Sequence, residues 1–271
     1  MEKYSRNQRV ALIAKTLVEN PNRIMSLSYF AELFNAAKST ISEDLLILRE
    51  TLDKQNQGMI ETIAGAAGGV KYRIRVPGAE KVRFKDDVVR YLSDPSRIVP
   101  GNFLYVTDLM MDPRIVGPAG AILAEHFQDT GADHIITVET KGIPLAYEVA
   151  RCLGIGLIVV RRNAKISEGT AVSINYLTGD QGMLSVMSLA KRSLKPDSRL
   201  VFIDDFLRGG GTVRGIIDLL HEFDSTLAGV GVMIASREQT DKVVPVPFVN
   251  ICDYYGVEEN RKLNIKSSNT V

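Results

Sequence analysis

Apolar residues recur at helical spacing at the start of the chain and predict a first helix. Val10, Ile13 and Leu17 would lie on one side of it. The helix is expected to end at Pro21, because proline cannot supply the amide that a further turn needs. A short second helix is expected after Leu27. The chain is therefore predicted to open with a small helical domain.

A third helix is predicted by an apolar stripe and by a capping signature. The stripe consists of Ile41, Leu45, Leu48 and Leu52. The signature is T-x-x-E, in which the hydroxyl of Thr40 and the carboxylate of Glu43 would accept hydrogen bonds from backbone amides at the helix start. Four polar side chains of this helix are expected to face water: Ser39, Thr40, Ser42 and Arg49.

A basic hairpin is predicted to follow the third helix. Residues 59–64 and 70–76 are strand-like, and a glycine-rich turn at residues 65–69 joins them. In the second run, apolar residues (Val70, Tyr72, Ile74 and Val76) alternate with cations (Lys71, Arg73 and Arg75). Three helices and a hairpin are the element order of a winged helix-turn-helix, whose third helix enters the DNA major groove while the wing contacts the backbone or the minor groove.

We therefore interpret residues 1–76 as a winged-helix DNA-binding domain. These residues include 11 Lys and Arg against 8 Asp and Glu, so any basic surface must be local. The predicted DNA contacts fall into three groups. Two are basic side chains near the N-terminus, Arg6 and Arg9, and basic side chains of the hairpin, Lys71, Arg73 and Arg75. The third lies at the start of the third helix and consists of Lys38, Ser39, Thr40 and Ser42. The alternative is a small α+β domain whose charges only solvate it.

Residues 77–271 are predicted to form an α/β domain. Apolar runs at residues 134–138, 156–160, 199–203, 229–235 and 248–252 alternate with helical segments at 144–153 and 212–223. Such runs indicate strands that are buried on both faces, hence a mostly parallel sheet, whose ligands bind beyond the carboxyl ends of the strands. Before them we expect an amphipathic stretch near Val88, a strand at 103–106 and a helix at 118–129.

The most informative segment is residues 200–212, where an apolar strand leads to two carboxylates and a triple glycine opens a helix. The glycines would let backbone amides approach an anion, and a helix N-terminus favours negative charge, so Arg208 to Thr212 are expected to bind phosphate. Asp204 and Asp205 would repel a phosphate unless they face sugar hydroxyls. The segment therefore predicts a site for a sugar 5′-phosphate.

Other nucleotide motifs fit this segment poorly. A Walker A loop requires a lysine after its glycines, and the dinucleotide fingerprint G-x-G-x-x-G requires glycine where Arg214 stands. The remaining alternative is an acidic strand end followed by a flexible turn.

The same residues resemble the phosphoribosyl pyrophosphate motif of type I phosphoribosyltransferases, most closely the xanthine and adenine branch. The resemblance extends over about residues 105–255: residues 138–142 are similar to the pyrophosphate loop, and residues 161–165 with 175–180 to the mobile catalytic loop. With a winged helix in front, the whole chain resembles the purine operon repressors of Gram-positive bacteria. The expected α/β domain is thus of the type I phosphoribosyltransferase class, with a Rossmann-like parallel sheet.

The resemblance implies an effector, phosphoribosyl pyrophosphate with Mg²⁺, and no obligatory cofactor. The two aspartates would hold ribose hydroxyls, the glycine turn the 5′-phosphate, and residues 140–142 the pyrophosphate. The implied effector-binding residues are Tyr105, Thr140, Lys141, Gly142, Lys165, Asp204, Asp205, Arg208, Gly209, Gly210, Gly211 and Thr212. No catalytic residue and no protein metal ligand are expected, because Mg²⁺ would be held largely through the effector itself.

The function expected from the resemblance is repression of purine biosynthesis and transport genes, relieved by phosphoribosyl pyrophosphate. Purine nucleotides or guanosine tetraphosphate are expected to compete with it, and a double-stranded operator with twofold symmetry implies a homodimer. One alternative is an active purine phosphoribosyltransferase with a nucleic-acid-binding extension, although residues 253–258 do not match a base-binding segment. Another is an RNA-binding or scaffold protein.

Composition sets limits on these readings. The chain has 271 residues and a net charge of +1, which excludes a protein that is basic all over. No apolar run approaches the roughly 20 residues of a membrane helix, and the first residues lack the pattern of a secretory signal, so we expect a cytoplasmic protein without a membrane partner. Cys152 and Cys252 are predicted to be buried free thiols.

Overall fold

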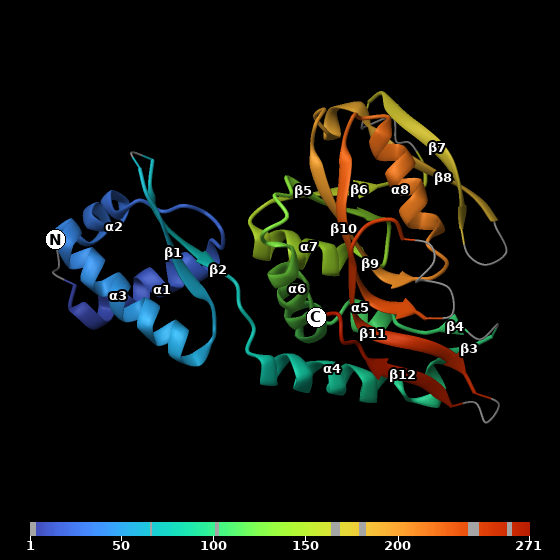
Figure 1. The fold of residues 1–271 in the computed structure, drawn as a ribbon, viewed down its shortest axis with the longest axis horizontal. Helices are drawn as coiled ribbons and strands as arrows, with labels where there is room; N and C mark the ends of the chain where they lie inside the picture. The colour runs from blue at the N-terminus through green and yellow to red at the C-terminus, as the bar shows by residue number, and fades with distance from the viewer. Residues whose placement is uncertain are drawn as a thin grey trace. The chain divides into compact units, whose positions relative to one another are not determined.

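A computed structural model describes residues 4–65, 67–100, 103–163, 169–178, 183–237, 244–258 and 262–271. The chain forms two compact units (Figure 1). The first comprises Met1–Gly78 and the short segment Arg151–Gly154, and the second comprises Ala79–Ala150 and Ile155–Val271. The domain boundary predicted at residue 76 lies two residues before the end of the first unit.

The first unit has the element order of a winged helix-turn-helix, as predicted. Its helices are α1 (Arg6–Glu19), α2 (Leu27–Phe34) and α3 (Lys38–Gln55), and an antiparallel hairpin of β1 (Met59–Ile63) and β2 (Gly69–Arg73) follows. The apolar stripes of α1 and α3 meet the aromatic side chains of α2 in one core, which includes Ile13, Leu17, Phe30, Phe34, Ile41, Leu45 and Leu48.

The capping box predicted at Thr40 and Glu43 is wrong. Asn35 adopts a left-handed conformation and ends α2, and α3 already begins at Lys38. The N-cap position is thus occupied by Ala37, which makes no side-chain capping bond, and Thr40 lies inside the helix. The start of α3 is therefore set by the turn at residues 35–37 and not by the T-x-x-E signature.

The hairpin strand β2 ends three residues earlier than predicted. Arg73 is its last residue, so Arg75 does not share the strand face of the other two wing cations. The Arg75 guanidinium instead donates a hydrogen bond to Oδ1 of Asn56 over 3.2 Å, just beyond the end of α3.

The second unit is built on a six-stranded sheet in the order β12-β11-β10-β9-β5-β6 (Figure 1). Its strands are β5 (His134–Val138), β6 (Gly156–Val160), β9 (Arg199–Leu207), β10 (Thr226–Ser236), β11 (Phe248–Val257) and β12 (Leu263–Ser267). All neighbouring strands run parallel except β11 and β12. The mostly parallel sheet confirms the predicted fold class, whereas the antiparallel edge strand β12 was not predicted.

The helices of this unit are α4 (Gly78–Leu92), α5 (Thr107–Met110), α6 (Pro113–Phe127), α7 (Ile143–Leu153) and α8 (Gly211–His221). Single 3-10 turns are η1 (Pro95–Arg97) and η3 (Lys191–Ser193), and β3 (Ile98–Val99) pairs with β4 (Phe103–Leu104). Helix α6 begins five residues before its predicted start, because Asp112 caps it and a proline occupies its first position. Strand β4 is two residues shorter than predicted.

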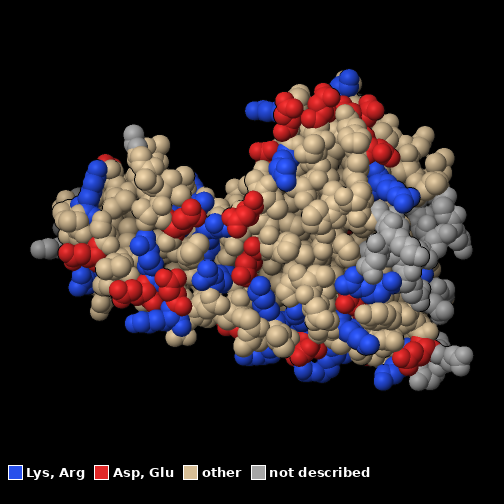
Figure 2. Space-filling view, in the orientation of Figure 1, with Lys and Arg blue, Asp and Glu red and all other residues tan. Residues whose placement is uncertain are grey.

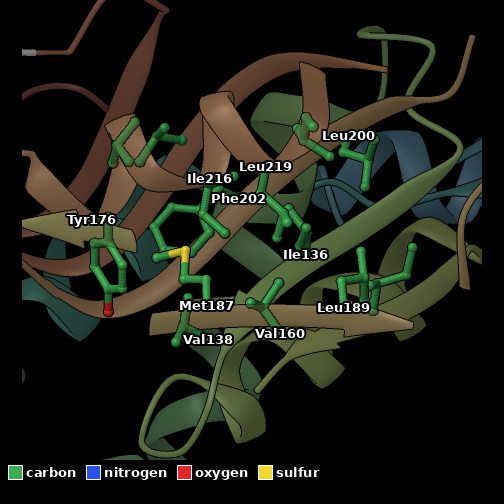
Figure 3. Close-up of a cluster of buried hydrophobic side chains, with 14 of the residues drawn as sticks. Ile136, Val138, Val160, Tyr176, Met187, Leu189, Leu200, Phe202, Ile216 and Leu219 are labelled. Atoms are coloured by element: carbon green, nitrogen blue, oxygen red, sulfur yellow. The ribbon is translucent and has the colours of Figure 1, made fainter. Parts of the chain in front are cut away.

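A hairpin of β7 (Ala171–Thr178) and β8 (Met183–Ala190) covers part of the sheet where the sequence predicted a mobile loop. Figure 3 shows Tyr176 and Met187 of this hairpin in one cluster with side chains of the sheet and of α8. A Cβ atom on Gly215 of α8 would lie 2.9 Å from Cβ of Tyr176, so the hairpin rests directly on the helix backbone. Each large apolar side chain fully buried here contributes about 1.5–3 kcal/mol.

Two further expectations concern the cysteines and the membrane. Cys152 and Cys252 are buried free thiols, as predicted. In the part of the chain that the structure describes, none of the helices combines the length and apolar character needed to cross a membrane.

Candidate functional site

A cavity of about 390 Å³ opens where β5 and β9 diverge. The two strands pair only from His134 to Ile136 with Leu200 to Phe202, and their carboxyl ends separate beyond these residues. The chain leaves β5 towards β6 and leaves β9 towards β10, so this crevice is the point of the sheet where ligands of α/β proteins bind. The lining residues are Val138, Glu139, Thr140, Lys141, Arg162, Tyr176, Ser185, Asp204, Asp205 and Thr212.

Asp204 and Asp205 face this crevice from within β9, which extends to Leu207 and not, as predicted, only to Ile203. The Asp205 amide donates to Oδ1 of Asp204 over 2.9 Å. Burial, and then the like charge of Asp205, raise the pKa of Asp204 well above its usual value, and the Arg162 guanidinium offsets part of the rise. The acid pair therefore favours a ligand that brings hydroxyl donors or positive charge.

The glycine turn between β9 and α8 has the backbone that an anion site requires. Gly209 and Gly210 have φ angles of 68° and 70°, in the left-handed region where side chains are disfavoured. Gly210 is the N-cap of α8, and no side chain caps the first turn of that helix. The first amides of α8 can therefore be satisfied by a phosphate, which the helix dipole also favours.

The loop after β5 lies against the acid pair. A Cβ atom on Gly142 would lie 2.5 Å from Oδ1 of Asp204 and 2.9 Å from Oγ1 of Thr137, so only glycine fits without a shift. Among the described residues, Oγ1 of Thr137 is buried and has no hydrogen-bond partner. The peptide bond between Glu139 and Thr140 is cis. Loop and strand β9 together form a cradle with an unsatisfied hydroxyl at its base.

Five residues that line the cavity were not among the predicted effector residues: Val138, Glu139, Arg162, Tyr176 and Ser185. The Glu139 carboxylate accepts a bond of 2.7 Å from the Arg162 amide and one of 3.3 Å from the Arg161 guanidinium, and so joins the loop after β5 to the end of β6. Tyr176 comes from the hairpin, and burial raises the pKa of its hydroxyl, which therefore stays a hydrogen-bond donor. The alternation of apolar and polar residues from position 172 to 176 could have indicated the strand that carries it.

The structure brings together five of the predicted effector residues around the cavity: Thr140, Lys141, Asp204, Asp205 and Thr212. Gly142 and the glycine turn adjoin them. Tyr105 does not line the cavity, and its backbone is bonded to Arg97. The Arg208 guanidinium lies 5.9 Å from the ring of Phe103 instead. Lys165 lies outside the described residues.

Asp204 and Asp205 are the two carboxylates of this cavity that could contribute ligands to a cation, and Glu139 lies nearby. Among the described residues, no group of three or more His, Cys, Asp and Glu side chains could hold a metal ion. Two neighbouring carboxylates can supply one or two ligands to Mg²⁺, which commonly keeps phosphate oxygens and waters as its others.

In the first unit, the predicted polar contacts lie at the start of α3. Lys38, Ser39 and Ser42 are exposed and Thr40 is half-buried. On the wing, the ammonium of Lys71 and the guanidinium of Arg73 lie 3.3 and 3.5 Å from one carboxylate oxygen of Glu61. Figure 2 shows acidic and basic side chains mixed over the visible face of this unit.

Arg9 is held inside the first unit. Its Nε and Nη2 donate to the two carboxylate oxygens of Asp44 over 2.7 and 3.2 Å. The side chain of Arg9 is 13% exposed and that of Asp44 is 0% exposed. This position argues against the DNA contact predicted for Arg9 and assigns the residue to the joint between α1 and α3.

Comparison with known proteins agrees with both units. A family model described as the N-terminal part of the bacterial purine repressor matches residues 5–74, and the phosphoribosyl transferase domain matches residues 108–256. An adenine phosphoribosyltransferase from Thermoanaerobacter pseudethanolicus has the same fold in the second unit, with a TM-score of 0.53 and 18% identity over 60% of this chain and 96% of its own. The class is therefore a winged-helix unit joined to a phosphoribosyltransferase-type unit.

Within that class, the chain belongs to the PurR family of purine biosynthesis transcriptional regulators. It is 40% identical to the purine biosynthesis transcriptional repressor PurR of Bacillus subtilis over 89% of this chain and 85% of that protein. It is also 32% identical to the purine biosynthesis transcriptional activator PurR of Lactococcus lactis subsp. lactis, over 88% of each chain. The family resemblance seen in the sequence is thus confirmed.

Proposed function

We propose that this protein represses purine biosynthesis and transport genes and that phosphoribosyl pyrophosphate, bound in the crevice between β5 and β9, releases it from DNA. The observation that carries the proposal is the cradle around Asp204: a second carboxylate, a loop that only Gly142 allows, and a glycine turn that opens α8. These features offer acceptors for two sugar hydroxyls beside an anion site.

The effector fits the chemistry of each part of the site. Asp204 and Asp205 would accept hydrogen bonds from the ribose hydroxyls, and Gly209 to Thr212 would bind the 5′-phosphate. Thr140, Lys141 and Gly142 would contact the pyrophosphate. Mg²⁺ would neutralise the pyrophosphate and add positive charge near the acid pair, which favours the ionised form of Asp204.

Repression is favoured over activation because the repressor from B. subtilis is the more similar of the two named relatives, at 40% against 32% identity. Release by an effector requires linkage: phosphoribosyl pyrophosphate must bind more weakly to the DNA complex by the same factor by which it weakens DNA binding. Purine nucleotides and guanosine tetraphosphate carry phosphates that the same glycine turn can bind, so they would compete.

We infer that the protein acts without turnover, as a cytoplasmic homodimer on a double-stranded operator, since the relatives are named as regulators. The second candidate is an active purine phosphoribosyltransferase, which the retained acid pair and glycine turn favour. Incubation with phosphoribosyl pyrophosphate, Mg²⁺ and each purine base separates the two. Nucleotide formation at an ordinary enzymatic rate would support the transferase.

The effector site is tested by Asp205→Ala. Binding to DNA is measured by fluorescence anisotropy of a labelled duplex that was selected for tight binding. The variant and the parent chain should bind this duplex with equal affinity. The variant should need at least tenfold more phosphoribosyl pyrophosphate for release, because a lost hydrogen bond to a charged group costs about 1.5–3 kcal/mol. Asp218→Ala, an exposed carboxylate on α8, is the matched control. If phosphoribosyl pyrophosphate releases the Asp205 variant normally, the proposed effector site is wrong. If the parent chain does not bind DNA, the proposed function itself is wrong.

A further inference from the structure

The start of α3 exposes a carboxylate that the proposed function leaves unused. Because Ala37 is the N-cap, Glu43 takes no part in capping, and its side chain is 67% exposed. Ser39 stands four residues before it and Leu46 three residues after it, so the three side chains lie on one side of the helix, opposite the buried stripe. Leu46 is 51% exposed, which is high for leucine in the middle of a helix.

Arg6 holds the carboxylate of Glu43 at this surface. Its Nη2 lies 2.9 Å from Oε2 of Glu43, and its Nε lies 3.5 Å from Oδ1 of Asp44. Asp44 is itself fixed by Arg9. The guanidinium of Arg6 is thus anchored on one side by a buried carboxylate, and on its other side it orients Glu43 and neutralises part of its charge.

A carboxylate on a DNA-binding helix has a restricted use. DNA phosphates repel a carboxylate, so a carboxylate lowers the affinity for every sequence unless two conditions hold. A neighbouring cation must offset its charge, and a hydrogen-bond donor of the DNA must contact it. In the major groove, the N4 amino group of cytosine is the donor that Glu and Asp side chains accept from. Glu43 has the accompanying cation, an exposed position and a place in the first turns of the helix.

We propose that Glu43 reads a base: its carboxylate accepts a hydrogen bond from N4 of a cytosine in the major groove, with Arg6 as its counter-ion. This inference rests on the proposed DNA-binding function. Leu46, one turn further on the same side, can contact a neighbouring thymine methyl group. The competing explanation is an ordinary surface ion pair, which would contribute about 0.2–1 kcal/mol to folding and nothing to base preference.

The test compares the base preferences of the full chain and of Glu43→Gln. Duplexes bound from a randomised pool are sequenced for both proteins. The parent chain should enrich cytosine at one or more positions, and the variant should lose about fivefold or more of that preference at one of them. Its affinity for random duplex should not fall, because a negative charge has been removed.

Glu50→Gln is the matched control. Glu50 is exposed on the same helix two turns further along, so the substitution changes the charge equally but should leave the base preferences unchanged. Identical profiles for Glu43→Gln and the parent chain would overturn the inference, as would a change confined to A·T positions. A parent chain with no sequence preference at all would contradict the proposed DNA-binding function as well. This result can be told apart from the failure of the Glu43 inference alone, in which the parent chain keeps its sequence preference.

Discussion

Each unit of this protein carries an aspartate that is at least half-buried, Asp44 in the first and Asp204 in the second, and the charges around the two differ. Asp44 on α3 is fully buried and accepts hydrogen bonds from Nε and Nη2 of Arg9. Asp204 on β9 has another carboxylate beside it, and burial raises its pKa. The chain itself supplies the counter-charge of Asp44, whereas Arg162 offsets only part of the charge around Asp204, which leaves room for a ligand to add more.

The comparison is tested most strongly by Asp44→Ala. Removal of the carboxylate leaves the charge of Arg9 mostly buried and without its main partner, which should lower the free energy of unfolding by about 3–5 kcal/mol. Urea denaturation of the full chain, followed by circular dichroism, measures the change. Asp53→Ala, an exposed position on the same helix, should stay within about 0.5 kcal/mol of the parent.

A double variant sharpens this prediction. Arg9→Met with Asp44→Leu replaces both charges by apolar groups of similar size and should recover most of the lost stability. If Asp44→Ala is no less stable than Asp53→Ala, the ion pair does not support the fold and the contrast with Asp204 disappears.

Gly142→Ala should have the next largest effect. The new Cβ atom would lie 2.5 Å from Oδ1 of Asp204, so the loop must shift, at a cost of about 1–3 kcal/mol in stability. A roughly tenfold higher concentration of phosphoribosyl pyrophosphate should then be needed for a given rise in melting temperature. Gly117→Ala in α6, where a Cβ atom meets nothing within 4 Å, is the control and should be neutral or slightly stabilising. Equal behaviour of the two variants would contradict the cradle.

The smallest expected effect is a gain in stability from Asp204→Asn. Because folding raises the pKa of Asp204, its ionised form costs free energy, and this cost grows as pH rises from the ordinary carboxyl pKa through the raised one. The variant should be more stable than the parent at pH 7, and the gap should close towards pH 3.

Thermal melting across this pH range checks the prediction, with Asp218→Asn as the exposed control. A variant that is less stable than the parent at pH 7 would mean that Asp204, like Asp44, is satisfied by the protein itself.

The features that followed from sequence are those that short segments determine. Helical stripes such as Ile41, Leu45 and Leu48, the apolar strands of the sheet and the run from Asp204 to Thr212 each carry their signal within a few residues. The features that escaped depend on distant partners. Arg9 meets a carboxylate 35 residues away, and charge alone could not separate that use from a phosphate contact.

The missing hairpin has a similar physical reason. The stretch from Ala171 to Thr178 is a strand only because β8 pairs with it and Gly215 of α8 leaves room for Tyr176. The T-x-x-E signature at Thr40 failed because the turn after Asn35 starts α3 before the signature is reached. The hairpin had a local signal in the alternation from position 172 to 176, but its pairing with β8 and the space at Gly215 are tertiary features that the segment alone does not contain.

Residue 142 offers a practical means of sorting related sequences. Only hydrogen fits between its Cα atom and the carboxylate of Asp204. A homologue that keeps both aspartates and the glycine turn but has a larger residue at this position must have rebuilt the loop after β5. A single column of a sequence comparison can therefore separate homologues that keep the geometry of this loop from those that have changed it.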